Sequence, residues 1–339
     1  MTDPQVETAP AVDPKVSVSQ VLDPNADLGA PARSQWLDIW MQFKNHRGAM
    51  VGLVIFVMIV LGVAVGPIVW TSDPQAIPPV VEMIKQRDAR PIYTLLWDQS
   101  AKVNFANPLG TDNLARDNLA RLLFGGRVSI AVGLTAMILA LFLGTLIGVL
   151  AGYFRRADGP LMRLTDLFLA LPLLPMILVA SLLFREPLSA IFGVEGGVFT
   201  LIVCLIGITS WMQTARIVRG DVLALKEREF VLAARSIGTP SRRIITRHML
   251  PNVLSPIMVS ATLGIATAII TESALSFLGF GFPPDFPTWG RLLNDSVNRM
   301  VSYPERVVWP GLLISLTVLS VNYIGDGLRD ALDPRIRGR

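Results

Sequence analysis

Six long apolar segments restrict the fold of this chain more than any other feature of its sequence. They comprise residues 48–70, 128–153, 161–184, 198–215, 253–280 and 307–328. A helix needs about 20 mostly apolar residues to cross a hydrocarbon core of ~30 Å. We therefore expect an all-α membrane protein, a six-transmembrane-helix bundle that spans residues 46–339 without a second soluble domain.

Two of these segments contain residues that should shape their helices. Pro172 and Pro175 lie inside the third segment and should kink it, which is tolerable where neighbouring helices satisfy the freed carbonyl groups. The second segment contains Gly144, Gly148 and Gly152 at four-residue spacing. Such a stripe of small residues allows close helix packing.

The distribution of Lys and Arg predicts the orientation, because cytoplasmic loops carry an excess of basic residues. The short loop YFRRADGPLMR holds three arginines, whereas REPLSAIFGVEGG, on the opposite side, holds one. This asymmetry places both termini and residues 216–252 in the cytoplasm (N-in and C-in). Residues 71–127 and 281–306 then form the larger outer segments, and 80–102 is expected to form a helix broken at Pro91.

Residues 1–45 differ from the rest of the chain in composition. They are rich in Pro, Asp, Ala and Val, and they have too little apolar surface to bury. No positive region followed by an apolar region occurs there, so we do not expect a cleaved signal peptide. The segment is expected to be a disordered cytoplasmic tail.

Charge and residue counts argue against a nucleic-acid partner, an internal disulfide and a metal site. The formal net charge of +4 is too small to indicate a nucleic-acid partner. The single cysteine, Cys204, lies in an apolar segment, so no internal disulfide can form. His46 and His248 are the only histidines, and neither is placed to form a metal cluster with Cys204. We expect no metal site.

Residues 216–252 interrupt the apolar pattern with a basic, kinked stretch. An amphipathic helix is expected from Gly220, and Gly238 can supply the left-handed residue that ends it. Thr239 is a suitable N-cap for a second short helix, which Pro251 would stop. The sequence therefore predicts a helix, a tight turn and a second helix.

The turn between these helices has the features of a docking surface. Ala233 and Ala234 are small, so another protein's backbone can approach them closely. Arg235, Arg242 and Arg243 suit an acidic or carbonyl-lined groove. The alternative is an interfacial helix pair whose arginines meet anionic lipid headgroups. The candidate residues are Leu232, Ala233, Ala234, Arg235, Ser236, Ile237, Gly238, Arg242 and Arg243.

Four stretches of the chain, in the right order, carry a resemblance to one family. AARSIG…LPN, within 233–252, looks like the EAA loop of ABC-importer permeases. PLGTDNLARDNLARLLFGGRVSIAVG (108–133) is similar to the LGTD-x-x-GRD motif of the dipeptide, oligopeptide and nickel branch. TESALSFLGFG (271–281) resembles its EASLSFLGLG, and GDGLRDALDPR (325–335) resembles the C-terminal end of its DppC/OppC-type subunits.

The chain departs from the family's motifs at three positions. Leu232 stands where the EAA motif has Glu, so any polar contact of that Glu with the ATPase is absent. In the LGTD motif, Ala115 replaces the second Gly and Ala120 replaces the Ser before the arginine.

The resemblance implies a type I ABC-importer permease of the bacterial plasma (inner) membrane, which is not an enzyme. Such a chain pairs with a second, homologous permease subunit and receives di- or oligopeptides from an extracytoplasmic substrate-binding protein. Two ATPase subunits, which bind the ATP and Mg, dock on residues 216–252, the coupling loop. Nickel chelates, glutathione and other small solutes are alternative substrates.

The lysines of the chain agree with this division of labour. A phosphate-binding loop needs Gly-x-x-x-x-Gly-Lys-[Ser/Thr], and no lysine here follows a glycine. The chain is therefore expected to bind no cofactor itself and to take its energy from a partner.

Glu272 is the one ionisable residue well inside a predicted span, and such residues usually face a cavity or a partner. One interpretation places Glu272 and Ser276 on the translocation path or at a gate. The other makes Glu272 a structural group that hydrogen-bonds to the turn of SFLGFG or to the partner subunit. A self-powered secondary transporter would need several intramembrane charges, and only Glu272 and Asp326 are candidates. An intramembrane enzyme would need a nucleophile–base pair or paired carboxylates at depth, which the sequence does not suggest.

Overall fold

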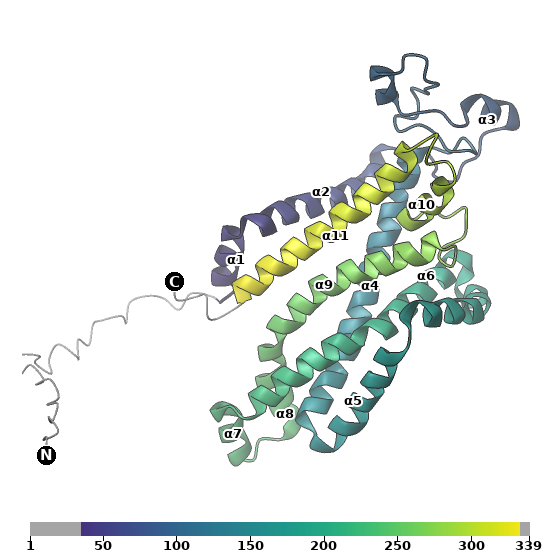
Figure 1. Cartoon of the computed structure of the whole chain (residues 1–339). Helices are drawn as coiled ribbons and strands as arrows, with labels where there is room; N and C mark the ends of the chain where they lie inside the picture. Colours follow the sequence, from purple (N-terminus) through teal and green to yellow (C-terminus); the bar gives the residue numbers. More distant parts are fainter. Residues whose placement is uncertain (1–34, 333–339) are drawn as a thin grey trace, which may run out of the picture.

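The computed structural model describes residues 35–332, and the regular secondary structure in this range is helical (Figure 1). The elements in chain order are α1 (Gln35–Asn45), α2 (Arg47–Val69), α3 (Val80–Gln86), η2 (Ile92–Leu96), α4 (Asn118–Tyr153), α5 (Arg155–Ala170), α6 (Leu173–Lys226), α7 (Glu229–Ser236), α8 (Ser241–Ile244), the π-helical turn η3 (Ile245–Met249), α9 (Leu250–Phe277), α10 (Trp289–Val297) and α11 (Glu305–Leu332).

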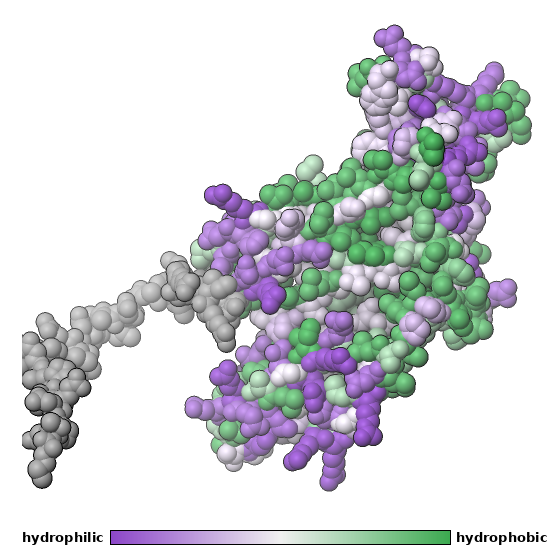
Figure 2. All heavy atoms as spheres, in the orientation of Figure 1, coloured by the Kyte–Doolittle hydropathy of each residue, from purple (hydrophilic) through white to green (hydrophobic). Residues whose placement is uncertain are grey.

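The long helices run side by side, with α7 and α8 at one end of the bundle and α10 at the other (Figure 1). We call these the α7 end and the α10 end. Apolar residues cover much of the middle of the bundle, and hydrophilic residues gather towards its two ends (Figure 2). This distribution is the one expected for a bundle surrounded by lipid.

Five helical stretches of the described range are long and apolar enough to cross a membrane: α2, α4, α6, the run Ser241–Phe277 and α11. The predicted spans 48–70, 128–153, 253–280 and 307–328 coincide with four of them. The predicted third span, 161–184, is divided between α5 and the first part of α6. The predicted fourth span, 198–215, lies in the later part of α6.

The third predicted span is broken rather than kinked. α5 ends at Ala170, and Leu171 and Pro172 have extended backbone before α6 begins. Proline disfavours the helical conformation in the residue before it, which explains a break at this point. Pro175 lies in the first turn of α6 and does not interrupt the helix.

α6 turns at Gly193, whose φ of 77° and ψ of 168° are accessible essentially to glycine alone. The element therefore consists of two helical stretches, 173–192 and 194–226. Gly193 lies within REPLSAIFGVEGG, the loop predicted between the third and fourth spans, so the position of the turn agrees with the prediction. The loop itself is helical on both sides of Gly193, which was not predicted.

Two further expectations differ from the structure. Residues 35–45, assigned to the disordered tail, form α1, whose Phe43 is buried against α2 and α11. Residues 1–34, the remainder of the predicted tail, lie outside the described residues. Pro251 does not stop a helix but lies at the start of α9, directly after the π-helical turn η3 and within the continuous helical run Ser241–Phe277.

The close packing of α4 and α6 depends on the predicted glycine stripe. A Cβ on Gly144 would lie 2.7 Å from the Trp211 carbonyl oxygen, and one on Gly148 would lie 2.6 Å from that of Ala215. At Gly152 the corresponding atom would be 2.7 Å from Val222 Cβ. These distances leave no room for a side chain, so the glycines set how closely α4 and α6 approach.

The region 71–117 lies beyond the α10 end of the bundle (Figure 1). It contains α3 and η2, with Pro91 directly before η2, so the predicted break at Pro91 is present. The helical parts are shorter than predicted, because α3 ends at Gln86 and η2 ends at Leu96. The region is attached to α11 by Trp309, whose indole N–H donates to the Tyr93 hydroxyl at 3.0 Å.

Candidate functional site

The inner face of α7 packs into the bundle. Val231 and Ala234 belong to a buried apolar cluster that also contains residues of α4, α6, α8, η3 and α9. Those residues are Val149, Tyr153, Val218, Val222, Ile244, Met249 and Val253. Because interiors are close-packed, a displacement of α7 must be passed to these helices.

The opposite face of α7 is exposed. Leu232 is 42% exposed, and Ile237, the residue directly after α7, is 82% exposed. The side chains of Ala233, Arg235, Ser236, Arg242 and Arg243 also lie at the surface. Ala234, in contrast, is only 8% exposed, so the expectation that it offers its small side chain to a partner is wrong. Its methyl group is needed for packing inside the chain.

The turn after α7 has the geometry that a glycine requires. Gly238 has a φ of 78°, its N–H donates to the Arg235 carbonyl at 3.0 Å, and the Thr239 N–H donates to the Ala234 carbonyl at 3.1 Å. This pair of hydrogen bonds is a Schellman motif, which ends a helix with a left-handed residue. No atom lies within 4 Å of a Cβ built on Gly238, so its backbone conformation, and not the available space, favours glycine.

The local boundaries around this turn differ from those predicted. The helix expected from Gly220 to Gly238 is divided, because α6 ends at Lys226 and α7 begins at Glu229. Pro240, not Thr239, precedes α8, and no side chain caps that helix.

The end of α4 and the start of α5 anchor the loop 216–252. Lys226 Nζ donates to the Tyr153 carbonyl at 2.9 Å, and Arg235 lies over the Tyr153 ring with its Cζ 5.9 Å from the centroid. Arg219 Nη2 donates to Asp158 Oδ2 at 2.7 Å, and this hydrogen bond lowers the pKa of the Asp158 carboxyl group. The loop is thus tied to the bundle while one face of α7 stays open.

Glu272 is fully buried inside this chain. The Ser276 hydroxyl donates to Glu272 Oε1 at 2.7 Å and the Ser273 hydroxyl donates to Oε2 at 3.5 Å. Ser129 and Thr288 lie beside the same carboxyl group. Ser129 Oγ accepts the Trp289 N–H at 3.3 Å, at the start of α10. Glu272 therefore lies where α4, α9 and α10 meet.

This arrangement agrees with the structural interpretation of Glu272. A Cβ on Gly281 would lie 2.1 Å from Ser276 Oγ, so the turn of SFLGFG packs directly on the serine that binds the carboxyl group. The carboxyl group is not accessible in this chain, so Glu272 does not line an open path here, and a role of Glu272 and Ser276 at a gate stays a prediction.

Sequence reasoning did not anticipate a buried network of charges at the α10 end. Asp112 Oδ2 accepts from Arg116 Nε at 2.7 Å and from Arg121 Nη1 at 2.6 Å. Arg121 Nη2 also donates to Asp295 at 3.1 Å, which links α4 to α10. The LGTD-like motif was the available signal, but spacing alone cannot identify a partner 174 residues away.

A second group of contacts extends this network to the region 71–117. Arg306 donates to Asp88 at 3.0 Å and to the Thr111 carbonyl at 2.6 Å. Asp117, from the same motif, caps α4 and accepts the Trp70 indole N–H at 2.6 Å. The motif therefore attaches this region to α2, α4, α10 and α11.

Ala115 has a φ of 61°, a conformation that costs a residue with a Cβ roughly 1–2 kcal/mol. This is the position at which the related motif has glycine. The departure from the motif thus replaces the residue that suits this backbone with one that does not.

Comparison with known proteins identifies the family. Residues 140–338 match the family described as binding-protein-dependent transport system inner membrane component. Residues 34–88 match the N-terminal TM domain of oligopeptide transport permease C.

Individual relatives match nearly the whole chain. It is 35% identical over 305 residues to the oligopeptide transport system permease protein OppC of Bacillus subtilis, covering 90% of this chain and 91% of the relative. It is 36% identical over 320 residues to the di/tripeptide transport system permease protein DppC of Pseudomonas aeruginosa, covering 93% and 96%. It is also 35% identical over 308 residues to the glutathione transport system permease protein GsiD of Pectobacterium atrosepticum, covering 90% and 93%. The chain therefore belongs to the family of binding-protein-dependent inner membrane transport components, among the multi-pass ABC permeases related to OppC and DppC.

Proposed function

We propose that this chain and a second, similar permease form the pathway by which di- or oligopeptides enter the cell, and that two partner ATPases drive it through the loop 216–252. The observation that carries the proposal is the two-sided packing of α7. Its inner face is buried against α4, α6 and α9, its outer face exposes Leu232, and Ile237 is exposed directly after the helix. A helix held in this way can pass a movement of a docked ATPase to the bundle.

The proposed topology has six crossings with both termini in the cytoplasm. α2, α4, the second stretch of α6, α9 and α11 supply five, and α5 with the first stretch of α6 supplies the sixth. α1 and the last residues of α11 both lie at the α7 end of the bundle (Figure 1). A chain that begins and ends on the same side of a membrane crosses it an even number of times, so this position agrees with six crossings. The arginines of the loop 216–252 then face the cytoplasm, as the basic-residue rule requires.

The coupling step needs a contact that differs between two states of the ATPase pair, because a contact that is equal in both shifts no equilibrium. The exposed face of α7 offers apolar and basic groups to such a contact. Since Leu232 replaces the Glu of the related motif, this position would meet an apolar part of the ATPase groove.

Peptides are the proposed substrate because two of the relatives described above carry oligopeptide or di/tripeptide transport in their names. Glutathione is the second candidate, favoured by the relative named as a glutathione permease. In both cases an extracytoplasmic binding protein would deliver the solute at the α10 end, where Glu272 holds α10 in place.

Reconstitution tests the proposal. The tagged chain should co-purify with an ATPase, and vesicles containing the complex and its binding protein should take up peptides only with ATP. Inactivating the ATPase should abolish uptake. Solute transport by the purified chain alone would contradict the proposal, and preferential uptake of glutathione would select the second substrate.

A substitution at Gly238 tests the coupling step itself. Proline fixes φ near −65°, so Gly238→Pro cannot adopt the observed φ of 78° and should reorient α8 relative to α7. We expect uptake to fall at least 10-fold while the complex still assembles. Gly238→Asn is the matched control, because asparagine tolerates the left-handed region, and it should retain most of the uptake. Normal uptake by the proline variant would exclude this role of the turn.

A further inference from the structure

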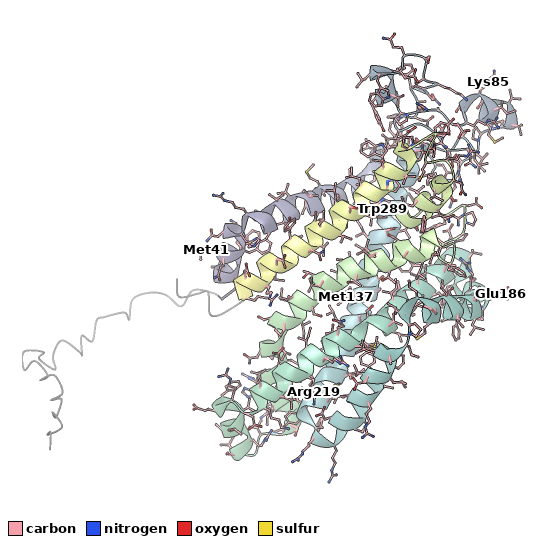
Figure 3. The ribbon with its side chains drawn as sticks, viewed as in Figure 1. Met41, Lys85, Met137, Glu186, Arg219 and Trp289 are labelled. Carbon is pink, nitrogen blue, oxygen red and sulfur yellow. The ribbon has the colours of Figure 1, made fainter. Side chains whose placement is uncertain are left out.

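α1 has two apolar faces, of which one packs against the bundle. Ile39 and Phe43 contact apolar residues of α2 and α11. Leu37, Trp40 and Met41 are exposed on the other side of the helix, where their three- and four-residue spacing places them on one face. Figure 3 shows Met41 on the side of α1 that is turned away from α11.

The exposed face of α1 adjoins a surface that lipid must cover. α2 is one of the helices that can cross the membrane, and it exposes an apolar stripe formed by Val51, Val54, Met58 and Leu61. His46 is the single residue between α1 and α2. The apolar face of α1 therefore begins where the lipid-facing stripe of α2 ends.

Two basic side chains lie near this face, and one carboxylate, Asp330, lies 3.6 Å from His46 Nε2. Lys44 Nζ lies 5.2 Å from the centroid of the Trp40 ring, and Arg47 is exposed at the first position of α2. Tryptophan rings and basic side chains are enriched together at the headgroup level of membranes. An amphipathic helix with these groups binds in the plane of a bilayer and is attracted to anionic lipids.

We propose that α1 lies in the headgroup region of the leaflet at the α7 end, with Leu37, Trp40 and Met41 inserted and with Lys44 and Arg47 beside the phosphates of anionic lipids. α1 would thus fix the depth of the α2–α11 pair in the membrane. This inference rests on the proposed crossing of α2, and it does not depend on the substrate or on the ATPases.

Spin-label accessibility tests the position of α1. A nitroxide is attached at Met41→Cys in a Cys204→Ser background, in the full chain with the subunits that co-purify with it, in vesicles of phosphatidylcholine and phosphatidylglycerol. Controls are Met58→Cys, expected in hydrocarbon, and Leu96→Cys on η2, expected in water.

The ratio of oxygen to nickel-chelate accessibility at position 41 should lie between those of the two controls and at least 3-fold above that of position 96. A ratio equal to that of position 96 would show that α1 lies in water. Protection from both reagents would show that a protein covers this face. Either result overturns the proposal, and because no uptake is measured, neither bears on import.

A second measurement tests the role of the basic groups. In the labelled protein that keeps Lys44 and Arg47, adding phosphatidylglycerol to phosphatidylcholine vesicles should raise the ratio of oxygen to nickel-chelate accessibility at position 41 about twofold. In a Lys44→Gln/Arg47→Gln variant this rise should disappear. A ratio that does not respond to the anionic lipid in either protein would refute the contact with phosphates.

Discussion

The two ends of the bundle use charged residues in opposite ways. At the α10 end, Arg116 and Arg121 are buried, and Asp112 accepts hydrogen bonds from both. At the α7 end, Arg242 and Arg243 are exposed, and within residues 35–332 neither forms an ion pair.

This difference indicates how each end is completed. A buried charge is tolerated only when it is paired and hydrogen-bonded, so the α10 end must be held together by the chain's own side chains. Exposed arginines carry no such requirement and keep their hydrogen-bonding capacity for another molecule. We infer that the α10 end is a rigid support, whereas the α7 end is a surface that a partner completes.

Removing the central carboxylate of the α10 end should give the largest effect on stability. Asp112→Ala leaves Arg116 and Arg121 buried without their shared partner, which should cost about 3–5 kcal/mol of unfolding free energy. Thermal unfolding in detergent measures the loss. Asp285 also lies near Arg116, at 3.8 Å, but it is 80% exposed, so Asp285→Ala should change the stability by less than about 0.5 kcal/mol. Equal effects of both variants would refute the distinction between buried and exposed pairs.

Filling the space between α4 and α6 should give the next largest effect. Gly148→Val places a side chain where a Cβ would already be 2.6 Å from the Ala215 carbonyl oxygen, at a cost of about 1–3 kcal/mol. No atom lies within 4 Å of a Cβ on Gly62, so Gly62→Val in α2 is the control and should be nearly neutral. The same unfolding assay compares the two, and a neutral Gly148→Val would show that α4 and α6 can separate freely.

A substitution at Ala115 should increase the stability, in contrast to the two substitutions above. Ala115→Gly removes the strain of a φ of 61° and should raise the stability of the α10 end by about 0.5–1 kcal/mol. Ala120→Gly, in the first turns of α4, should instead lower it by about the same amount, because glycine weakens helices. Hydrogen exchange of residues 108–121 in the two variants provides the measurement. Destabilisation by both would argue against strain at Ala115.

The exposed arginines of the α7 end should contribute least to folding. Arg242→Ala/Arg243→Ala should change the unfolding free energy by less than about 0.5 kcal/mol, since surface charges stabilise little. We expect the same variant to retain several-fold less ATPase when the complex is purified in moderate salt. Full retention of the ATPase would show that these arginines serve another purpose, such as contact with lipid.

Much of the fold followed from local sequence features. The lengths of the apolar segments predicted membrane-crossing helices, because hydrocarbon thickness sets the length of a span. The left-handed turn at Gly238 was also predictable, since few residues other than glycine adopt that conformation. The glycine spacing in α4 indicated close packing, and the family motifs identified the class of protein.

The tertiary structure decided which distant groups meet. The pairing of Arg121 with Asp295, the inward position of Ala234 and the burial of Glu272 depend on contacts between separate helices. The break at Pro172 and the turn at Gly193 also determine which stretches of α5 and α6 pack together. Local patterns specify helices because hydrogen bonds within a helix join near neighbours, whereas the cost of burying a charge depends on partners that only the assembled bundle brings together.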